Sequence, residues 1–172
     1  MALQGKFIVN NKPLSPLIFS GVGAFMAYSG DTIHRNRGGC TAVKDSGPIP
    51  AGQYWVVDRP SGGVRSRIKT WAKDTANSMI GTPTNHAEWF ALYRDDGKID
   101  DHTWVNEIQR GNFRLHPRGG RGASLGCITV QNRSDFETIR RALLCTSIVP
   151  VPDTGLHAYG VIEVIAHGHT CP

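Results

Sequence analysis

Apolar and polar residues alternate in short segments through the first sixty positions, and this pattern predicts β-strands separated by turns. Asn10 and Asn11 accept positive φ angles, so they favour a hairpin between the first two segments. Pro60 cannot donate a ladder hydrogen bond, so the fourth strand is expected to end just before it. Strands are therefore predicted at 6–9, 17–19, 21–28 and 53–58.

The second half of the chain gives further strand signals at 89–93, 98–99, 113–115 and 159–166. Asp96-Gly97 lies between the first two of these segments and favours a hairpin there. The last segment is rich in β-branched residues, so we expect a central strand. Residues 63–80 contain a weak helical pattern that Gly, Thr and Asn interrupt.

One helix is predicted at about 135–145, because apolar residues recur there at helical spacing. Ser134 and Glu137 have the spacing of a capping box at its start. Cys145, at its end, is expected to be a small buried side chain. The pattern predicts one domain over residues 1–172, mainly β and either sandwich-like or barrel-like, with one well-defined helix and short helical insertions.

Composition and charge exclude several classes of protein. The 20 Gly and 10 Pro lack a collagen period and accompany 40% hydrophobic residues, so they indicate tight turns in an ordered fold. No stretch approaches the roughly 18 apolar residues of a membrane helix, so no membrane span is expected. The net charge of +5 is scattered and no nucleic-acid-binding motif accompanies it, so nucleic acid is not an expected partner.

The first residues do not form a Sec-type signal, because polar Asn10, Asn11 and Lys12 interrupt the segment before an apolar core could form. The protein is therefore expected to be made in the cytoplasm without a cleavable leader. It either works there or leaves by another export route.

The loop from His116 to Cys127 carries the candidate chemistry. Cysteine attacks as a thiolate and needs a base, which His116 can supply if the loop folds back on itself. Four glycines between them give the loop that freedom. Gly126, with Cys127, can expose backbone N–H groups as an oxyanion hole. Ser124 can bind substrate or hold the loop, while arginines add positive potential, namely Arg114, Arg118 and Arg121.

This pattern resembles the catalytic motif of the YkuD-type L,D-transpeptidases, although Leu125 stands where those enzymes often have His. It is more similar still to the type VI-secreted L,D-transpeptidase effectors. The resemblance extends over roughly residues 15–132 through segments that occur in the same order: 19–23, 27–30, 47–54, 58–63, 91–97 and 113–117.

The resemblance implies an L,D-transpeptidase-like fold and an antibacterial enzyme that acts on peptidoglycan tetrapeptide stems in the periplasm of target bacteria. It implies Cys127 as nucleophile, His116 as base and Gly126 in the oxyanion hole, and it places Tyr28 and Arg114 near the substrate cleft. Substrate contacts are therefore expected from Tyr28 and Arg114, and the chemistry of the loop adds Ser124 and Arg118. The expected activity is removal or exchange of the terminal D-alanine through a thioester, without a cofactor. The expected partners are a cognate immunity protein and a component of the secretion apparatus.

Other interpretations of the same residues stay open. His167, His169 and Cys171 would share one face of a strand and could bind zinc, although we expect no metal. Alternatively, Cys171 could form a disulfide with Cys40 in an oxidising compartment.

The paired acids at 95–96 and 100–101 could serve a glycosidase or a calcium loop, but turn chemistry explains them better. The four Trp residues are expected mostly in the core, with room for one at the substrate cleft. A cysteine amidase or endopeptidase is one alternative function, but such enzymes normally place Cys before His. A non-catalytic cell-wall-binding module is the other.

Overall fold

The computed structural model describes residues 1–59 and 86–172, and the helical pattern noted at 63–80 lies outside these residues. The first strands are β1 (Leu3–Val9), β2 (Ser15–Phe19), β3 (Gly23–Tyr28), β4 (Gly52–Asp58), β5 (Phe90–Arg94) and β6 (His102–Val105). They are followed by β7 (Ile108–Gly111), β8 (Arg114–Pro117), β9 (Ile128–Val130), β10 (Val149–Pro150) and β11 (His157–Ala166). The helical elements are η1 (Thr32–His34), η2 (Gly38–Cys40), η3 (His86–Glu88) and α2 (Arg133–Cys145).

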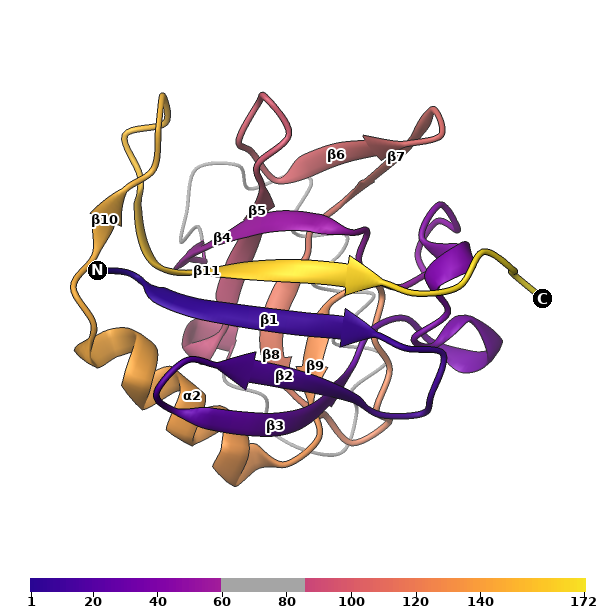
Figure 1. The fold of residues 1–172 in the computed structure, drawn as a ribbon, viewed down its shortest axis with the longest axis horizontal. Coiled ribbons are helices and arrows are strands. Elements are labelled where there is room, and N and C mark those ends of the chain that lie inside the picture. The colour runs from indigo at the N-terminus through magenta and orange to yellow at the C-terminus, as the bar shows by residue number, and fades with distance from the viewer. Residues whose placement is uncertain (60–85) are drawn as a thin grey trace.

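Eight strands close into a barrel in the order β1-β2-β3-β9-β8-β5-β4-β11, because β11 also pairs with β1 (Figure 1). The β1–β11 pairing is parallel and runs from Leu3 opposite Gly160 to Val9 opposite Ala166. The predicted mainly β class, with a barrel and one clear helix in the described residues, is confirmed. The last strand is central as predicted, since it pairs with β1, β4 and β10.

Strand periodicity explains how the barrel fills its interior. In β2, Leu17 and Phe19 are buried while Ile18 is exposed, as alternation across a strand requires. Helix α2 contacts β8, β9 and β11 and buries one stripe. That stripe consists of Phe136, Ile139 and Leu143.

The predicted hairpin at Asn10-Asn11 is confirmed: β1 pairs antiparallel with β2, and Asn11 has a φ of 61°. The capping box is wrong, because the helix begins earlier and Ser134 lies inside it. Asn132 occupies the N-cap and donates to the Asp135 carboxylate, while Glu137 forms an ion pair with Arg133.

The second predicted hairpin is also wrong. After β5 the chain does not return along the same strand; β5 pairs instead with β4 and β8. The chain continues into β6 and β7, which form a separate two-stranded sheet that the sequence pattern did not predict. The acids of the turn therefore have tertiary partners: Asp96 accepts from Thr103, and Asp101 binds Arg114.

Cys145 is exposed, so its predicted burial is wrong. It lies two residues beyond Leu143, about 200° around the helix from that buried side chain. No helix among the described residues has the length and apolar character needed to cross a membrane.

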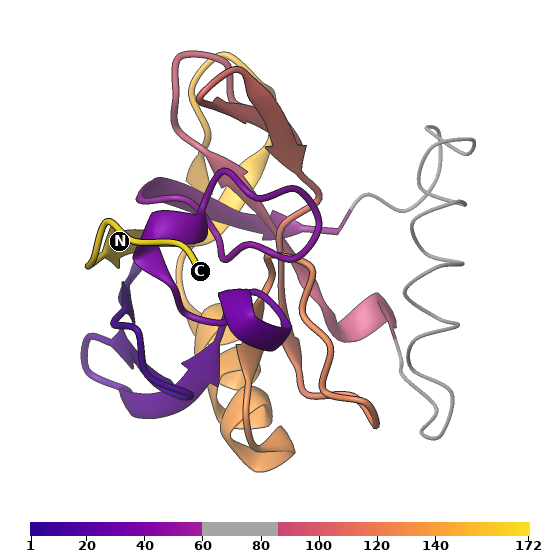
Figure 2. The ribbon, with the colours of Figure 1, turned by 90° about the vertical axis from the view of Figure 1, so that its right-hand side faces the viewer.

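The C-terminal segment lies against the region around residue 40 (Figure 2) and is joined to it by a disulfide between Cys40 and Cys171. β11 ends at Ala166, so His167, His169 and Cys171 do not share a strand face, and the zinc alternative loses its basis. In the described part of the chain the one cluster of metal-ligating groups is His34 with Cys40 and Cys171, whose sulfurs are bonded to each other.

We expect loss of this disulfide to destabilise the fold, because it closes a loop over a sequence separation of 131 residues. The paired substitution Cys40→Ser and Cys171→Ser should lower the free energy of unfolding by roughly 2–5 kcal/mol in urea denaturation. Cys145→Ser is the matched control and should have little effect, since that thiol is free and exposed. Equal stability of the double variant and the native protein would contradict this prediction.

Candidate active site

The parallel pairing of β8 with β9 places the two predicted catalytic residues on one face of the sheet. His116 lies opposite Thr129, and Leu115 opposite Ile128. Cys127 directly precedes β9 and lies two residues before Thr129, so strand alternation directs it to the same face as His116. His116 and Cys127 are therefore diagonal neighbours, a separation that a ring-sized side chain can reach across.

Both nitrogens of the His116 imidazole have defined neighbours. Nδ1 lies 2.8 Å from the carbonyl oxygen of Pro117, which can only accept, so Nδ1 carries the proton. Nε2 therefore presents its lone pair and lies 3.3 Å from the Thr129 hydroxyl. The ring also stacks on Trp89, with centroids 4.3 Å apart and planes 19° apart. The side chain is thus held in one orientation and one tautomer.

Burial keeps the imidazole neutral. It lowers the pKa of His116 to about 4, and the charges of His86 and Arg114 act in the same direction. The hydrogen bond to Pro117 opposes the shift because it favours the protonated ring. At neutral pH the ring can therefore accept a proton at Nε2.

Cys127 is 2% exposed, and its Sγ lies 3.8 Å from the carbonyl oxygen of Asn112. Burial raises the pKa of the thiol to about 11. The Arg114 charge and its backbone N–H lower the pKa, as does Arg110, while Asp101 raises it. Within the described part of the chain, no hydrogen bond joins this thiol to the imidazole of His116. Both groups are neutral in this arrangement.

The turn before the thiol needs a glycine. Gly126 has a φ of +95°, and a Cβ there would lie 2.7 Å from Nη2 of Arg110 and 3.0 Å from the Phe113 ring. Ser29 donates to the Gly126 carbonyl, and Ser124 donates to the Cys127 carbonyl at 2.9 Å. Ser124 is buried, so of its two predicted uses it holds the loop here.

Tyr28 and Arg118, both predicted to contact the substrate, occupy different environments. Tyr28 is buried and its hydroxyl donates to the Gly122 carbonyl at 2.8 Å, while the Arg35 guanidinium lies 4.3 Å from its ring centroid. Arg118 is exposed, and its backbone N–H donates to the Val130 carbonyl. Tyr28 thus braces the loop between His116 and Cys127, and Arg118 presents its side chain to solvent.

Arg114 is a buried cation with a specific counter-charge. Its two terminal nitrogens donate to the two carboxylate oxygens of Asp101 at 2.7 and 2.6 Å. Nη1 also donates to the Phe113 carbonyl at 2.8 Å. The bidentate pair holds a positive charge beside the thiol and uses up the guanidinium face that a substrate carboxylate would need.

Three residues at the site were not predicted from the sequence. Thr129 faces His116, Trp89 stacks on it, and Asp101 pairs with Arg114. Only Thr129 had a local signal, because it lies two residues after Cys127 on a strand. The other two come from segments whose position depends on the tertiary fold.

Two hollows border the site. Asn112 and Leu125 line a hollow of about 210 Å³ next to the thiol. Trp89 and Arg59 line a cleft of about 450 Å³ on the imidazole side.

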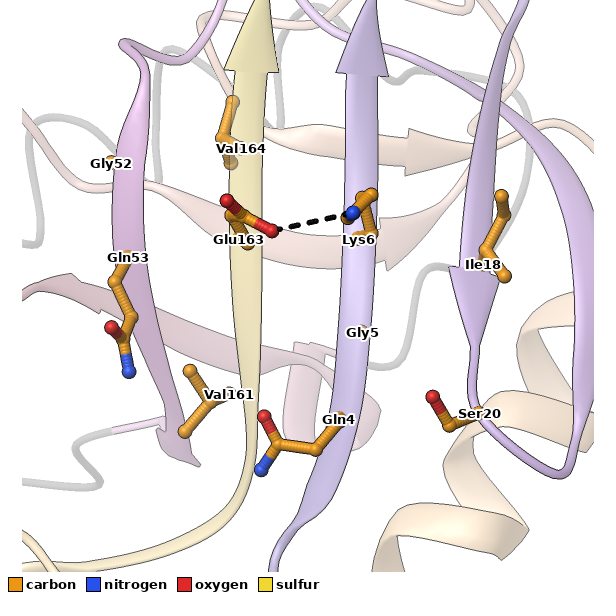
Figure 3. A pocket seen from close by; sticks show the side chains of 10 residues that line it. All are labelled: Gln4, Gly5, Lys6, Ile18, Ser20, Gly52, Gln53, Val161, Glu163 and Val164. Carbon is orange, nitrogen blue, oxygen red and sulfur yellow. Dashed lines mark ion pairs between the residues drawn. The ribbon is translucent and has the colours of Figure 1, made fainter.

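A third hollow, of about 730 Å³, lies across β1, β2, β4 and β11, on the opposite wall of the barrel from β8 and β9 (Figure 3). It is open and carries the exposed ion pair of Lys6 and Glu163, whose Nζ and Oε2 are 3.6 Å apart. Its lining contains neither His116 nor Cys127, so this hollow is separate from the candidate active site at β8 and β9.

Comparison with known families identifies the chain. The Tlde1 domain model matches residues 23–154, a span that runs from β3 past α2 and includes His116 and Cys127. No curated protein matches the chain. The matched span covers well over half of the sequence and agrees with the resemblance noted for its motifs. The chain belongs to the Tlde1 domain family, the type VI secretion L,D-transpeptidase effectors.

Proposed function

We propose that the protein is a cysteine acyl-transfer enzyme that removes or exchanges the terminal D-alanine of peptidoglycan tetrapeptide stems. The observation that carries this proposal is the shared sheet face of His116 and Cys127, with Nδ1 of the imidazole held by Pro117 and Nε2 left as the base. Membership of the Tlde1 domain family supports the substrate class.

The proposed reaction begins when Sγ of Cys127 attacks the carbonyl at the L-centre of diaminopimelate. The thiol proton passes to Nε2 of His116, and the backbone N–H groups of Gly126 and Cys127 stabilise the oxyanion. The C–N bond to D-alanine then breaks, and the imidazolium returns the proton to the leaving amine. Water resolves the thioester to a tripeptide, or the amine of a D-amino acid resolves it to an exchanged stem.

Reaching this geometry requires two side chains to leave their present partners. Sγ must turn from the Asn112 carbonyl toward the imidazole, a rotation about a single χ1 angle. The Thr129 hydroxyl must release Nε2, to which it now donates. Because thiol and imidazole are both neutral beforehand, the proton transfer accompanies the attack and no preformed ion pair is used.

The positive charges of Arg114 and Arg110 support the same mechanism. Both lower the pKa of the Cys127 thiol and so favour the thiolate as it forms. Each guanidinium is fixed by several acceptors, Arg114 by Asp101 and Arg110 by carbonyls of the 41–48 segment. Such fixed charges need no reorganisation during the reaction.

We further propose a site of action in the periplasm of target bacteria, with one catalytic domain spanning residues 1–172, delivery by a secretion-apparatus component and neutralisation in sibling cells by a cognate immunity protein. The pairing of β1 with β11 supports one domain, because it joins both ends of the chain in one barrel. The Cys40–Cys171 disulfide supports an oxidising compartment such as the periplasm.

Replacement of the nucleophile tests the proposed function directly. Cys127→Ala should lower release of D-alanine from purified tetrapeptide muropeptides by at least about a thousandfold, because no thioester can form. His116→Gln should also be severely impaired, and Cys145→Ser should keep wild-type activity. Mass spectrometry of the products would detect loss of alanine alone. Wild-type trimming by Cys127→Ala, or cleavage within crosslinks by the native protein, would contradict the proposal.

Alkylation of Cys127 should depend steeply on pH. With a thiol pKa of about 11, only about one thiolate in a thousand is present at pH 8, so labelling by iodoacetamide should rise about tenfold per pH unit up to that range. Peptide mass spectrometry would follow Cys127 separately from the exposed Cys145, which should label faster. A Cys127 rate that already levels off near pH 7 would instead indicate a thiolate–imidazolium pair.

Asp101→Asn should destabilise the fold by about 3 kcal/mol, because it leaves the buried Arg114 cation without its counter-charge. Asp100→Asn is the matched control; its partner Lys98 is exposed, so the cost should stay below about 1 kcal/mol. Urea denaturation measures both. Equal effects of the two substitutions would show that the buried pair has no special contribution.

A further inference from the structure

The cleft on the imidazole side of the site contains buried polar atoms that have no hydrogen-bond partner in the described part of the chain. It measures about 450 Å³ and lies between the end of β4, η3 and helix α2. The lining residues that matter for its chemistry are Asp58, Arg59, His86, Trp89 and Arg140. Three of these five residues contain a buried nitrogen atom that lacks a hydrogen-bond partner within residues 1–59 and 86–172.

Trp89 Nε1, His86 Nε2 and Arg140 Nε are all buried, and among residues 1–59 and 86–172 none of them has a hydrogen-bond partner. The Trp89 side chain is 3% exposed, and its indole N–H can only donate. The Nε–H group of the Arg140 guanidinium likewise can only donate. Buried donors without acceptors are rare in folded proteins and cost free energy, so the Trp89 and Arg140 donors at one cleft indicate an acceptor that binds there.

The charges at the cleft favour an anionic acceptor. Glu88 is paired with Arg133 at 2.6 Å, and Asp58 accepts from the Tyr159 hydroxyl at 2.9 Å. By contrast, within residues 1–59 and 86–172 no ion pair engages Arg59 or Arg140. Two guanidinium groups are therefore available to one ligand, and guanidinium matches the geometry of a carboxylate.

Arg59 is already directed by its neighbours. Its Nη1 donates to the His86 carbonyl at 3.2 Å, and its Cζ lies 5.8 Å from the Trp89 ring centroid. Burial is the main cause that lowers the pKa of Arg59, and the Arg114 charge lowers it further. Asp101 and a thiolate at Cys127 act in the opposite direction. Arg59 thus connects the cleft electrostatically to the reacting sulfur.

Trp89 connects the cleft to His116, which is the proposed base and, in the second step, the proposed general acid. It stacks on His116, the group that would protonate the leaving amine. In D-alanine the carboxylate is separated from that amine by a single carbon atom. A leaving residue whose amine is at His116 therefore keeps its carboxylate close to the imidazole, within reach of the side on which Trp89 stacks.

We propose, on the basis of the acyl-transfer function above, that this cleft binds the free α-carboxylate of the D-amino acid that leaves or replaces the stem terminus, through Arg59, Arg140 and the Trp89 indole N–H. The cleft then selects stems that end in a free carboxylate. It also holds the acceptor amino acid in the exchange reaction, since the same carboxylate is present in that ligand.

The test uses Cys127→Ala protein, so that binding is measured without turnover. The indole N–H resonance of Trp89, identified by its loss in Trp89→Phe, is followed by NMR during titration with D-alanine and, separately, with D-alaninamide. D-alanine should shift this resonance, and D-alaninamide should bind at least about tenfold more weakly, because its carboxylate is replaced by a neutral amide.

Charge-removing variants then locate the contact. Arg59→Gln and Arg140→Gln should each weaken D-alanine binding about tenfold or more, while Arg59→Lys should retain much of it. Arg141→Gln, an exposed neighbour on the same helix, is the matched control and should bind like the parent. Absence of a Trp89 shift, equal binding of the amide, or no effect of either Arg→Gln substitution would overturn the proposal.

These outcomes are separable from the fate of the proposed function. D-alanine binding that fails in a protein whose Cys127→Ala variant has lost trimming activity overturns the carboxylate cleft alone. Trimming that survives Cys127→Ala overturns the cysteine mechanism, and carboxylate binding through Arg59 and Arg140 would still be decided by the titrations.

Discussion

The parallel pairing of β8 with β9 is the constraint on which the rest of the site depends. It brings together two strands separated by the glycine-rich loop and sets their register, with His116 opposite Thr129. A shift by one residue would move Cys127 to the other face of the sheet, away from the imidazole. The barrel fixes this register, because β8 is also paired with β5 and β9 with β3.

Burial sets the chemistry of the pair. It lowers the pKa of His116 and raises that of Cys127, so the proposed base and the proposed nucleophile are both neutral. The nearby Arg114 charge, held by Asp101, acts against this shift and lowers the pKa of the thiol. A neutral thiol beside a neutral imidazole suits a protein of the Tlde1 domain family, which consists of enzymatic type VI effectors directed at peptidoglycan in other bacteria. The family also implies an immunity protein.

A continuous set of contacts links the disulfide to the turn before Cys127. Cys40 is bonded to Cys171, and the segment that follows it supplies the Thr41 and Gly47 carbonyls to Arg110. Arg110 in turn lies where a side chain at Gly126 would project. The disulfide and the turn before Cys127 therefore belong to one packed unit.

Local sequence determined what each segment could do, since alternation, helical spacing and the Asn10-Asn11 turn depend only on neighbouring residues. It also identified the nucleophile and base as candidates, because the glycines and the family motif lie in one continuous loop. Tertiary structure decided the β6–β7 sheet, the Cys40–Cys171 pairing and the role of Asp101, since their partners are remote in sequence. It also decided that Trp89 stacks on the imidazole, because strand order around a closed barrel is a global property that no local pattern encodes.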